Sequence, residues 1–307
     1  MAASSGSTPP RTILVVDNGC TPCVQITDEL RTTASFEILR SEVNTGSAGG
    51  YHLGLARLLE TPDWTHVWML DDDNLPDPLC LENLLKFQLG LPEGSIAVSH
   101  RPDRREFLAL AQGGGQPPPA RNSFQEFTFS GLLRRVLPHR DQTPGQGEIP
   151  LYAFGYGGAL IPRAALQDGK CLPDPRLFLY HDDSEWAWRL WNHGHRAFLC
   201  TTAIIKDIDT PWGGFRRNGA SPLFSTQTHR SKLWFSLRNR AWLERQMGFS
   251  GLRHDGNAML WIALMVARTL VAERSFKDAF GGFQVAWRAY REGSKGRLTP
   301  FPPAANS

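Results

Sequence analysis

The stretch Trp68–Pro78, "WMLDDDNLPDP", places three consecutive carboxylates directly after an apolar run. Asp71, Asp72 and Asp73 would repel one another, and a divalent cation that takes oxygen ligands relieves this repulsion most simply. Mg²⁺ or Mn²⁺ held in this way also binds phosphate oxygens. An acidic turn in which Asp73 or Asp77 caps the next helix is the structural alternative. The stretch alone leaves both interpretations open.

Three other stretches carry polar groups that could join such a site. "VVDNGC" (Val15–Cys20) ends an apolar run with Asp17, which could accept hydrogen bonds from a nucleobase or ribose. "NTGSAGGYHLG" (Asn44–Gly54) is a glycine-rich turn whose backbone amides could approach a phosphate or a sugar, although it follows neither the Rossmann nor the Walker pattern. "LFLYHDDSEWAWRLWNHG" (Leu177–Gly194) places a histidine and two aspartates just before an amphipathic helix.

Alternating strand-like and helix-like segments would position these residues. Apolar runs predict strands at Arg11–Asp17, Phe36–Val43, Thr65–Leu70 and Ser95–His100, and helix-length segments lie at Cys23–Ala34, Tyr51–Leu59 and Asp77–Leu89. This alternation predicts an α/β sheet covered by helices, with ligands bound at the carboxyl ends of the strands. The acidic residues after the first and third predicted strands would lie at that edge.

Two regions depart from the alternation. Between Arg101 and Glu148 the Gly/Pro-rich pieces "GGGQPPPA" and "DQTPGQGE" predict a long excursion, which is typical of a functional lid or of disorder. From about Thr228, three amphipathic helices are expected. The segment Pro211–Ser307 has 15 Lys and Arg against 5 Asp and Glu, a balance of +10, which leaves −7 for residues 1–210.

The basic C-terminal third limits the classes of partner. Such a surface suits anionic lipid headgroups or a phosphorylated acceptor, and ordinary solvated helix faces are the alternative. No recognised binding motif accompanies the charge, so a nucleic-acid partner is not expected.

Composition predicts a globular protein of the cytoplasm. The chain has 307 residues, 41% of them hydrophobic, and can bury a sizeable core. Its longest apolar run, "AMLWIALMVARTLVA" (Ala258–Ala272), is short and contains Arg268, so no membrane-spanning helix is predicted, and no secretory signal is visible at the N-terminus. Five cysteines without a framework spacing are expected to be reduced, and the single "CTPC" at Cys20–Cys23 is a weak signal for redox or zinc chemistry.

The order of the motifs resembles the family-2 inverting glycosyltransferases of the GT-A fold, on the branch of the galactofuranosyltransferases and rhamnosyltransferases. The matching pieces are "VVDNG", "NTGSAGG", "WMLDDD", "FGYGGALIPRAAL", "FLYHDDSEWAWRL", "WFSLRNRAWL" and "AWRAYREGSKGRL". The resemblance covers Arg11–Leu298 apart from the excursion at 101–148. It implies a GT-A domain at 11–227 and a basic helical region at 228–298.

The resemblance also implies an activity. The chain would transfer a sugar with inversion from a UDP- or dTDP-linked donor to a hydroxyl of a glycan or lipid-linked acceptor, as in cell-wall or polysaccharide biosynthesis. Mg²⁺ or Mn²⁺ would assist the departure of the nucleoside diphosphate. A cytoplasmic location is expected, with a peripheral position at the inner face of the membrane if the basic C-terminal helices contact anionic lipid.

Site residues follow from the same resemblance. Asp183 would be the general base. The expected metal ligands are Asp71, Asp73 and Asp207; the donor-binding residues are Asp17, Asn44, Gly46 and Asp72; and the acceptor-binding residues are His181, Asp182, Tyr156 and Trp186. For the two aromatic residues, plain packing is an equal alternative. Asp207 stands where galactofuranosyltransferase-like members have a metal-binding histidine. Asp209 is a second candidate, and the alternative is that the third protein ligand is lost.

Family members begin with a further strand and helix before the segment that matches "ILVVDNG", so the resemblance implies that the first β-α unit is missing here. Two other functions stay open. A catalytically inactive relative that binds a nucleotide-sugar or glycan would keep the same motifs. A metal-dependent nucleotidyltransferase could also use acidic strand ends, although it would not need "HDDSEW".

Overall fold

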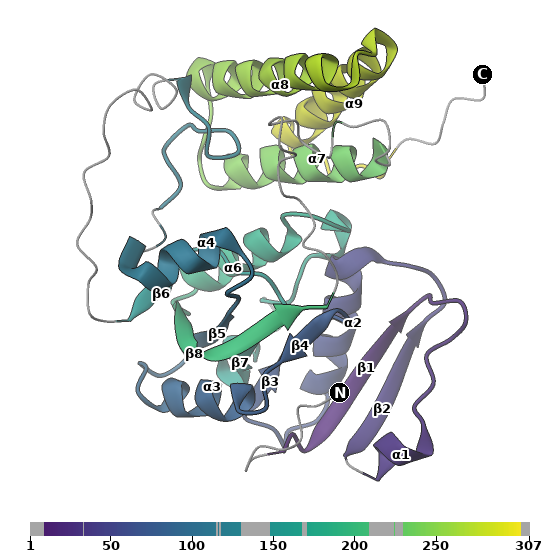
Figure 1. Ribbon diagram of the computed structural model, residues 1–307, viewed down its shortest axis with the longest axis vertical. Helices are drawn as coiled ribbons and strands as arrows, with labels where there is room; N and C mark the ends of the chain where they lie inside the picture. The colour runs from purple at the N-terminus through teal and green to yellow at the C-terminus, as the bar shows by residue number, and fades with distance from the viewer. Residues whose placement is uncertain are drawn as a thin grey trace. The chain divides into compact units, whose positions relative to one another are not determined.

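The computed structural model of the chain describes residues 9–32, 34–114, 116, 118–129, 148–167, 171–208, 224 and 230–301 (Figure 1). The chain forms two compact units. The first comprises Met1–Pro117, Asp141–Phe178 and Asp182–Thr210, and the second comprises Pro118–Arg140, Leu179–His181 and Pro211–Ser307. The predicted domain boundary at 227/228, part of the predicted excursion (130–147) and Asp209 lie outside the described residues.

The first unit begins with a two-stranded parallel sheet. β1 (Thr12–Asn18) pairs with β2 (Ser35–Ser41) in a register that runs from Thr12 opposite Ser35 to Asn18 opposite Ser41. Within the described residues this pair shares no strand with the larger sheet of the unit. The helix predicted over Cys23–Ala34 is present only as α1 (Asp28–Arg31). The backbone N–H of Val24 donates to Asp17 Oδ2, so the loop that precedes α1 is held in a different conformation.

A six-stranded mixed sheet forms the centre of the first unit. Its strands are β3 (His66–Trp68), β4 (Asn74–Pro76), β5 (Ile96–His100), β6 (Ile149–Leu151), β7 (Ala159–Pro162) and β8 (Ala197–Asp207). The order is β3-β7-β5-β8-β4, and β6 also pairs with β8. β7 is antiparallel to both β3 and β5, whereas β5 is parallel to β8. Therefore β3, β5 and β8 run in the same direction and end at the same edge.

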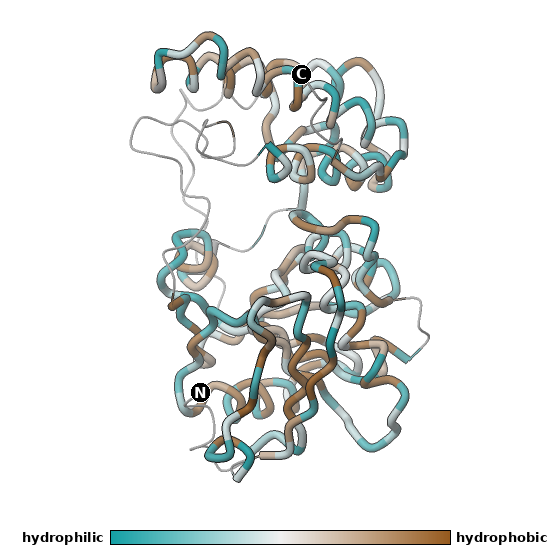
Figure 2. Tube along the Cα trace, turned by 90° about the vertical axis from the view of Figure 1, so that its right-hand side faces the viewer, coloured by the Kyte–Doolittle hydropathy of each residue, from teal (hydrophilic) through white to brown (hydrophobic). Residues whose placement is uncertain are grey.

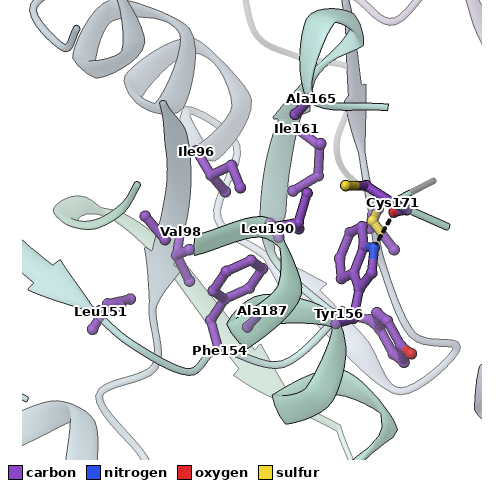
Figure 3. Close-up of a cluster of buried hydrophobic side chains, with 14 of the residues drawn as sticks. Ile96, Val98, Leu151, Phe154, Tyr156, Ile161, Ala165, Cys171, Ala187 and Leu190 are labelled. Carbon is purple, nitrogen blue, oxygen red and sulfur yellow. Dashed lines mark hydrogen bonds between the residues drawn. The ribbon is translucent and has the colours of Figure 1, made fainter. Parts of the chain in front are cut away.

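Alternating side chains of these strands build a core on each face of the sheet. Ile96 and Val98 of β5 pack into one cluster with Phe154 and Leu190, as Figure 3 shows, whereas Ala97 packs into the other cluster with Cys80 and Leu84 of α3. Figure 2 shows hydrophobic residues concentrated along the strands. The helices of this unit are α2 (Gly46–Leu59), α3 (Cys80–Leu89), α4 (Arg105–Ala109) and α6 (Asp182–Asn192). The predicted class, a mixed α/β sheet covered by helices, is confirmed.

The second unit contains the expected C-terminal helices, α7 (Arg230–Gln246), α8 (Leu252–Glu273) and α9 (Phe276–Ser294). The buried Glu244 accepts from Arg240 Nε at 2.5 Å and lies 2.8 Å from His254 Nε2. In α8, the window Leu252–Ala272 is long and apolar enough to cross a membrane, by length and composition only, and 22% of it is buried. The sequence-based prediction that no segment is long and apolar enough is therefore wrong for this helix, although one such helix is by itself weak evidence for a membrane span.

Candidate active site

The polar edge of the six-stranded sheet is formed where β3, β5 and β8 end. Asp71 and Asp73 follow β3, Arg101 follows β5, and Asp207 is the last residue of β8. Because the three strands are parallel to one another, their carboxyl ends bring these four residues together. The short β4 returns antiparallel to β8 with Asn74 opposite Asp207, which adds an amide side chain to the same edge.

Asp207 is held by two arginines. Arg101 Nη1 lies 2.6 Å from Asp207 Oδ1, and Arg104 places Nη2 at 2.6 Å and Nε at 2.8 Å from Asp207 Oδ2. The Asp207 side chain is 2% exposed. Paired guanidinium–carboxylate contacts of this kind are strong charge-assisted hydrogen bonds. Both oxygens of Asp207 are therefore engaged by the chain itself.

Arg101 connects Asp207 to the acidic turn after β3. Its buried side chain donates through Nη2 to Gly157 O at 2.8 Å and to Asn74 Oδ1 at 3.1 Å, and Nη2 lies 3.9 Å from Asp71 Oδ2. Asn74 donates in turn to Asp73 Oδ1 at 3.0 Å. Burial, followed by the charges of Asp71 and Asp207, raises the pKa of Asp73. The turn after β3 is thus an acidic group with a buried cation beside it.

The other two aspartates of this turn reach toward solvent. The Asp71 side chain is 41% exposed, and its Oδ1 accepts a hydrogen bond of 2.6 Å from Tyr51 Oη on α2. Asp72 is exposed. A ligand could therefore reach Asp71 directly, whereas Asp207 is enclosed.

A second pair of carboxylates begins α6. Asp182 is buried, and its Oδ2 accepts from Ser47 Oγ at 2.6 Å. Asp183 Oδ1 accepts from Ser184 N at 2.6 Å and from Ser184 Oγ at 3.2 Å. Among the described residues, no ion pair links either aspartate to a basic side chain. Burial and then the charge of Asp183 raise the pKa of Asp182, and burial raises the pKa of Asp183.

The loop Gly155–Gly158 lies between the two acidic groups. A Cβ atom at Gly157 would collide with Asn74 Oδ1 and Asp71 Oδ2 and would lie 2.5 Å from Arg101 Nη2. A Cβ atom at Gly155 would lie 3.7 Å from Asp183 Oδ2. A single residue, Tyr156, therefore separates the glycine packed against Asp71 and Arg101 from the glycine beside Asp183.

Tyr156, which lies between these two glycines in the sequence, is buried. Its ring lies 4.2 Å from the ring of Tyr51, at an interplanar angle of 32°. Its hydroxyl lies beside the carboxylate of Asp182. Burial, followed by the charges of Asp182 and Asp183, raises the pKa of Tyr156 well above its ordinary value. A buried hydroxyl in this position could donate to the carboxylate of Asp182 or to a ligand oxygen.

Trp186 was predicted to contact the acceptor, and the structure corrects this. The side chain is 0% exposed, and its indole N–H donates to the carbonyl of Cys171 inside the core cluster (Figure 3). It cannot stack on a sugar in this arrangement. The alternative considered for it, plain packing, is the correct one.

His181 belongs to the second unit. It has φ of +57°, and its Nε2 lies 3.4 Å from Gln125 Nε2. Burial and then the charge of Arg240 lower the pKa of His181 to about 3, so the ring is neutral at pH 7. Within the same unit, Asn239 Nδ2 donates to the carbonyl oxygens of Leu179 and Tyr180, which fixes the segment that carries His181.

The residues predicted to bind the donor mostly shape two loops. Asp17 is buried, and its oxygens accept from the backbone N–H groups of Cys20 at 2.9 Å and Val24 at 3.1 Å. Asn44 Oδ1 accepts from Gly46 N at 2.8 Å. Gly46 has φ of +72°, and a Cβ atom there would collide with the carbonyl of Phe178, so only glycine fits. The predicted contacts of these residues with a donor stay predictions.

Sequence reasoning missed the arginines and hydroxyl groups of the site. Arg101 and Arg104 belong to "SHRPDRRE", a basic run directly after a predicted strand, and this position could have identified them. Ser47 and Tyr51 lie within the quoted glycine-rich stretch but were not singled out. Their role depends on contacts with Asp182 and Asp71, which are 135 and 20 residues away in sequence.

The predicted metal set fits the geometry only in part. Asp71 is exposed and Asp73 is half-buried, but both oxygens of Asp207 accept hydrogen bonds from Arg101 and Arg104. No group of three or more His, Cys, Asp or Glu side chains among the described residues could hold a metal ion. The three-carboxylate arrangement expected from the sequence is therefore not formed.

Comparisons with known proteins give a limited picture. No protein-family model matches the chain, and no curated protein matches it. A structure described as "GalNAc-T7 with UDP, GalNAc and Mn2+" aligns with a TM-score of 0.47 and 13% identity, over 76% of this chain and 41% of that chain. A structure of A197 from STIV aligns with a TM-score of 0.38 and 13% identity, over 69% of this chain and 93% of that chain. The function has to be argued from the side chains of the site.

Proposed function

We propose that the chain is an inverting glycosyltransferase of the GT-A type that transfers a sugar from a nucleotide-diphosphate donor to a hydroxyl of a glycan or lipid-linked acceptor. One observation supports this most: the loop Gly155–Gly158 places Asp183 beside the polar strand edge that carries Asp71. Sugar transfer with inversion needs these two groups together, one to accept a proton and one to hold a diphosphate. The order of the sequence motifs supports family 2 and the galactofuranosyltransferase or rhamnosyltransferase branch.

In this proposal Asp183 is the general base. Its Oδ1 accepts both hydrogen bonds from Ser184, and no described residue donates to Oδ2, which faces Gly155. Oδ2 would take the proton of the acceptor hydroxyl while the acceptor oxygen attacks the anomeric carbon. The bond from that carbon to the diphosphate breaks, and its electron pair leaves with the nucleoside diphosphate. Asp182 is less suited to this role because Ser47 already occupies its Oδ2.

Tyr156 and Asp71 complete the assignment. Asp71 and Asp72 reach solvent at the edge where a donor would lie. Asp17, Asn44 and Gly46 lie on loops that precede this edge in the sequence and would also contact the donor. The buried hydroxyl of Tyr156, beside Asp182, would donate to an acceptor or donor oxygen. Of the predicted metal ligands, only Asp71 and Asp73 could hold Mg²⁺ or Mn²⁺, which would supply Lewis-acid chemistry where it binds. Asp207 takes no part in that binding here, because two arginines hold both its oxygens.

Donor binding tests this proposal first. A donor that binds only the native state raises the unfolding temperature by mass action. We expect the full chain to be stabilised by a UDP- or dTDP-linked sugar and not by a free sugar, and we expect the product made on a synthetic alkyl glycoside to have the opposite anomeric configuration by NMR. A product with the donor's configuration would exclude inversion. An unfolding temperature that no nucleotide-sugar changes would remove the proposed function.

We also propose that the second unit makes a peripheral contact with anionic membrane at the cytoplasmic inner face. The +10 balance of Pro211–Ser307 supports it, as do exposed apolar residues on α8 and α9, which include Leu252, Val271 and Phe276. Each basic residue near such a surface contributes about 1 kcal/mol, and salt screens this attraction. Co-sedimentation with phosphatidylserine vesicles that is lost at high salt is expected. Equal binding to neutral vesicles would contradict the electrostatic part.

A further inference from the structure

The strand-end acidic group already contains its own cations. Three carboxylates, those of Asp71, Asp73 and Asp207, lie around two guanidinium groups. Arginine stays protonated under any condition in which a protein is folded. Two positive charges therefore face three negative ones before any ligand arrives. The charge compensation that the sequence pattern assigned to a divalent cation is supplied in large part by the chain.

Arg101 occupies the centre of this group. Nη1 binds Asp207, and Nη2 lies within 3.9 Å of oxygens from Asp71, Asn74 and Gly157. The missing side chain of Gly157 is what leaves space for the guanidinium, because a Cβ atom there would lie 2.5 Å from Nη2. A cation that receives oxygens from several sides has the coordination environment of a bound metal, with hydrogen bonds in place of metal–oxygen bonds.

Arg104 differs from Arg101 in its exposure. Its Nε and Nη2 both bind Asp207 Oδ2, while the side chain remains 35% exposed. Among the described residues, none accepts a hydrogen bond from its Nη1. A guanidinium held by one edge in this way is fixed in orientation and keeps donors for a phosphate, which arginine binds well because of its planar fork.

We propose that Arg101, held by Asp207, takes the place of a divalent cation in this site, and that Arg104 binds the diphosphate of the donor, so that donor binding does not require a divalent metal. The inference rests on the proposed function for the identity of the ligand. The part of the inference that concerns Arg101 and the metal does not rest on the proposed function, since metal binding can be measured without a donor. A purely structural ion pair would predict lower stability in arginine variants but unchanged metal binding.

The first experiment titrates the full chain with Mn²⁺ alone, followed by the paramagnetic resonance signal of free Mn²⁺. Wild type should bind Mn²⁺ only weakly, because Arg101 repels it from Asp71 and Asp73. Arg101→Met leaves the same carboxylates with one positive charge fewer, and we expect its affinity for Mn²⁺ to rise at least about tenfold, on the order of one ion-pair contribution in a partly buried site. Arg57→Met is the matched control. Arg57 also pairs with two acidic residues of the first unit, Glu37 and Glu60, and its variant should bind Mn²⁺ as wild type does.

The second experiment measures binding of UDP and of dTDP with EDTA and with Mn²⁺. Wild type should bind one of them with the same affinity in both conditions, within about twofold. Arg104→Met removes a charged hydrogen bond at a partly exposed position and should weaken that binding about tenfold to a hundredfold. Because Arg104 is partly exposed, this variant should fold even if Arg101→Met does not, and its circular dichroism and melting curve check this.

Three results would overturn the inference: tight Mn²⁺ binding by wild type, an unchanged Mn²⁺ affinity in a folded Arg101→Met, or nucleotide binding that EDTA abolishes. If Arg101→Met does not fold, the nucleotide measurements decide. Nucleotide binding that resists EDTA and is weakened in Arg104→Met supports the inference. Nucleotide binding that is unchanged in Arg104→Met contradicts it. If neither nucleotide binds under any condition, the proposed function fails, whereas the Mn²⁺ titration still decides the role of Arg101.

Discussion

The two groups of acidic residues in the first unit differ in how their negative charges are compensated. At the strand edge, Asp207 is buried against Arg101 and Arg104, so its charge is compensated. At the start of α6, Asp182 and Asp183 are buried without such an ion pair among the described residues, and burial raises the pKa of both carboxyl groups. A compensated carboxylate holds its neighbours in place. An uncompensated one can accept a proton, which is the property a general base needs.

The largest effect should come from removing the base. Asp183→Asn keeps the shape of the side chain but cannot accept a proton, so sugar transfer should fall by about 10² to 10⁴, the usual contribution of a positioned general base. Donor affinity should hardly change, and calorimetry with the donor measures it. Asp182→Asn is the matched control, because it makes the same change in the adjacent carboxylate of the buried pair. An inactive Asp182→Asn with an active Asp183→Asn would show that the roles within the pair are reversed.

Removing the compensated carboxylate should have the next largest effect. Asp207→Ala leaves Arg101 buried without its main partner, and breaking a buried ion pair from one side costs about 3–5 kcal/mol of unfolding free energy. Urea denaturation measures this loss. Asp63→Ala is the control, since Asp63 pairs with Arg11 at 3.8 Å with a side chain that is 72% exposed, and an exposed pair contributes about 1 kcal/mol or less.

The result for Asp207→Ala also separates the two views of this residue. A metal ligand kept ready among other carboxylates would be repelled by them, so its removal would leave the metal-free chain as stable as before or more stable. A loss of several kcal/mol without added metal would instead identify Asp207 as the partner of the arginines. The comparison between the two acidic groups depends on this difference.

The spacing between the two groups can be tested at Gly157. Gly157→Ala adds a methyl group where Asp71, Asn74 and Arg101 already meet, and overpacking of this kind costs about 1–3 kcal/mol. Nucleotide binding should weaken in the same variant because Asp71 must move. Gly90→Ala is the control: its nearest neighbour would be Phe87 O at 3.5 Å, an ordinary contact, so stability should change by less than about 1 kcal/mol. Equal stabilities of the two variants would contradict the crowding at the site.

The elements and the acidic groups could be predicted from sequence because both are local patterns. The four predicted strands all correspond to strands of the structure, and the paired aspartates lie where an apolar run ends. The start of α2 was placed too late, at Tyr51 instead of Gly46, because glycines weaken a helix in general while the structure needs Gly46 for its close approach to Phe178. The contacts of Asp17 with the backbone of its own loop could not be predicted, and its predicted contact with a donor stays a prediction.

The compensation of one group and not the other could not be predicted. Arg101 and Asp207 are 106 residues apart, and they meet only because β5 and β8 are neighbours with parallel registers. Periodicity indicates that strands exist but does not give their order in a sheet. The burial of Trp186 has the same origin, since an amphipathic helix pattern does not say which aromatic residue faces the core. Which charged residues meet in a site therefore depends on the order of the strands in the sheet, and the local sequence pattern does not give this order.

The last prediction concerns the pH dependence that Asp182 gives to stability. In the unfolded chain this carboxyl group loses its proton near pH 3.9, the ordinary value for aspartate. In the folded chain burial, followed by the charge of Asp183, raises its pKa, although the hydrogen bond from Ser47 opposes the rise. Between the unfolded and the folded pKa the unfolded state therefore binds fewer protons than the native state, and stability falls as pH increases, by up to about 1.4 kcal/mol per pH unit. Below that window both states are protonated, and above it both are charged, so the contribution is constant. Asp182→Asn keeps an oxygen for Ser47 but carries no charge, so its stability relative to wild type should increase from about pH 4 toward neutral pH, and urea unfolding of both chains across that range measures the difference. A difference that stays constant, or that favours wild type as the pH rises, would mean that the carboxyl group is compensated after all and that the two acidic groups are alike.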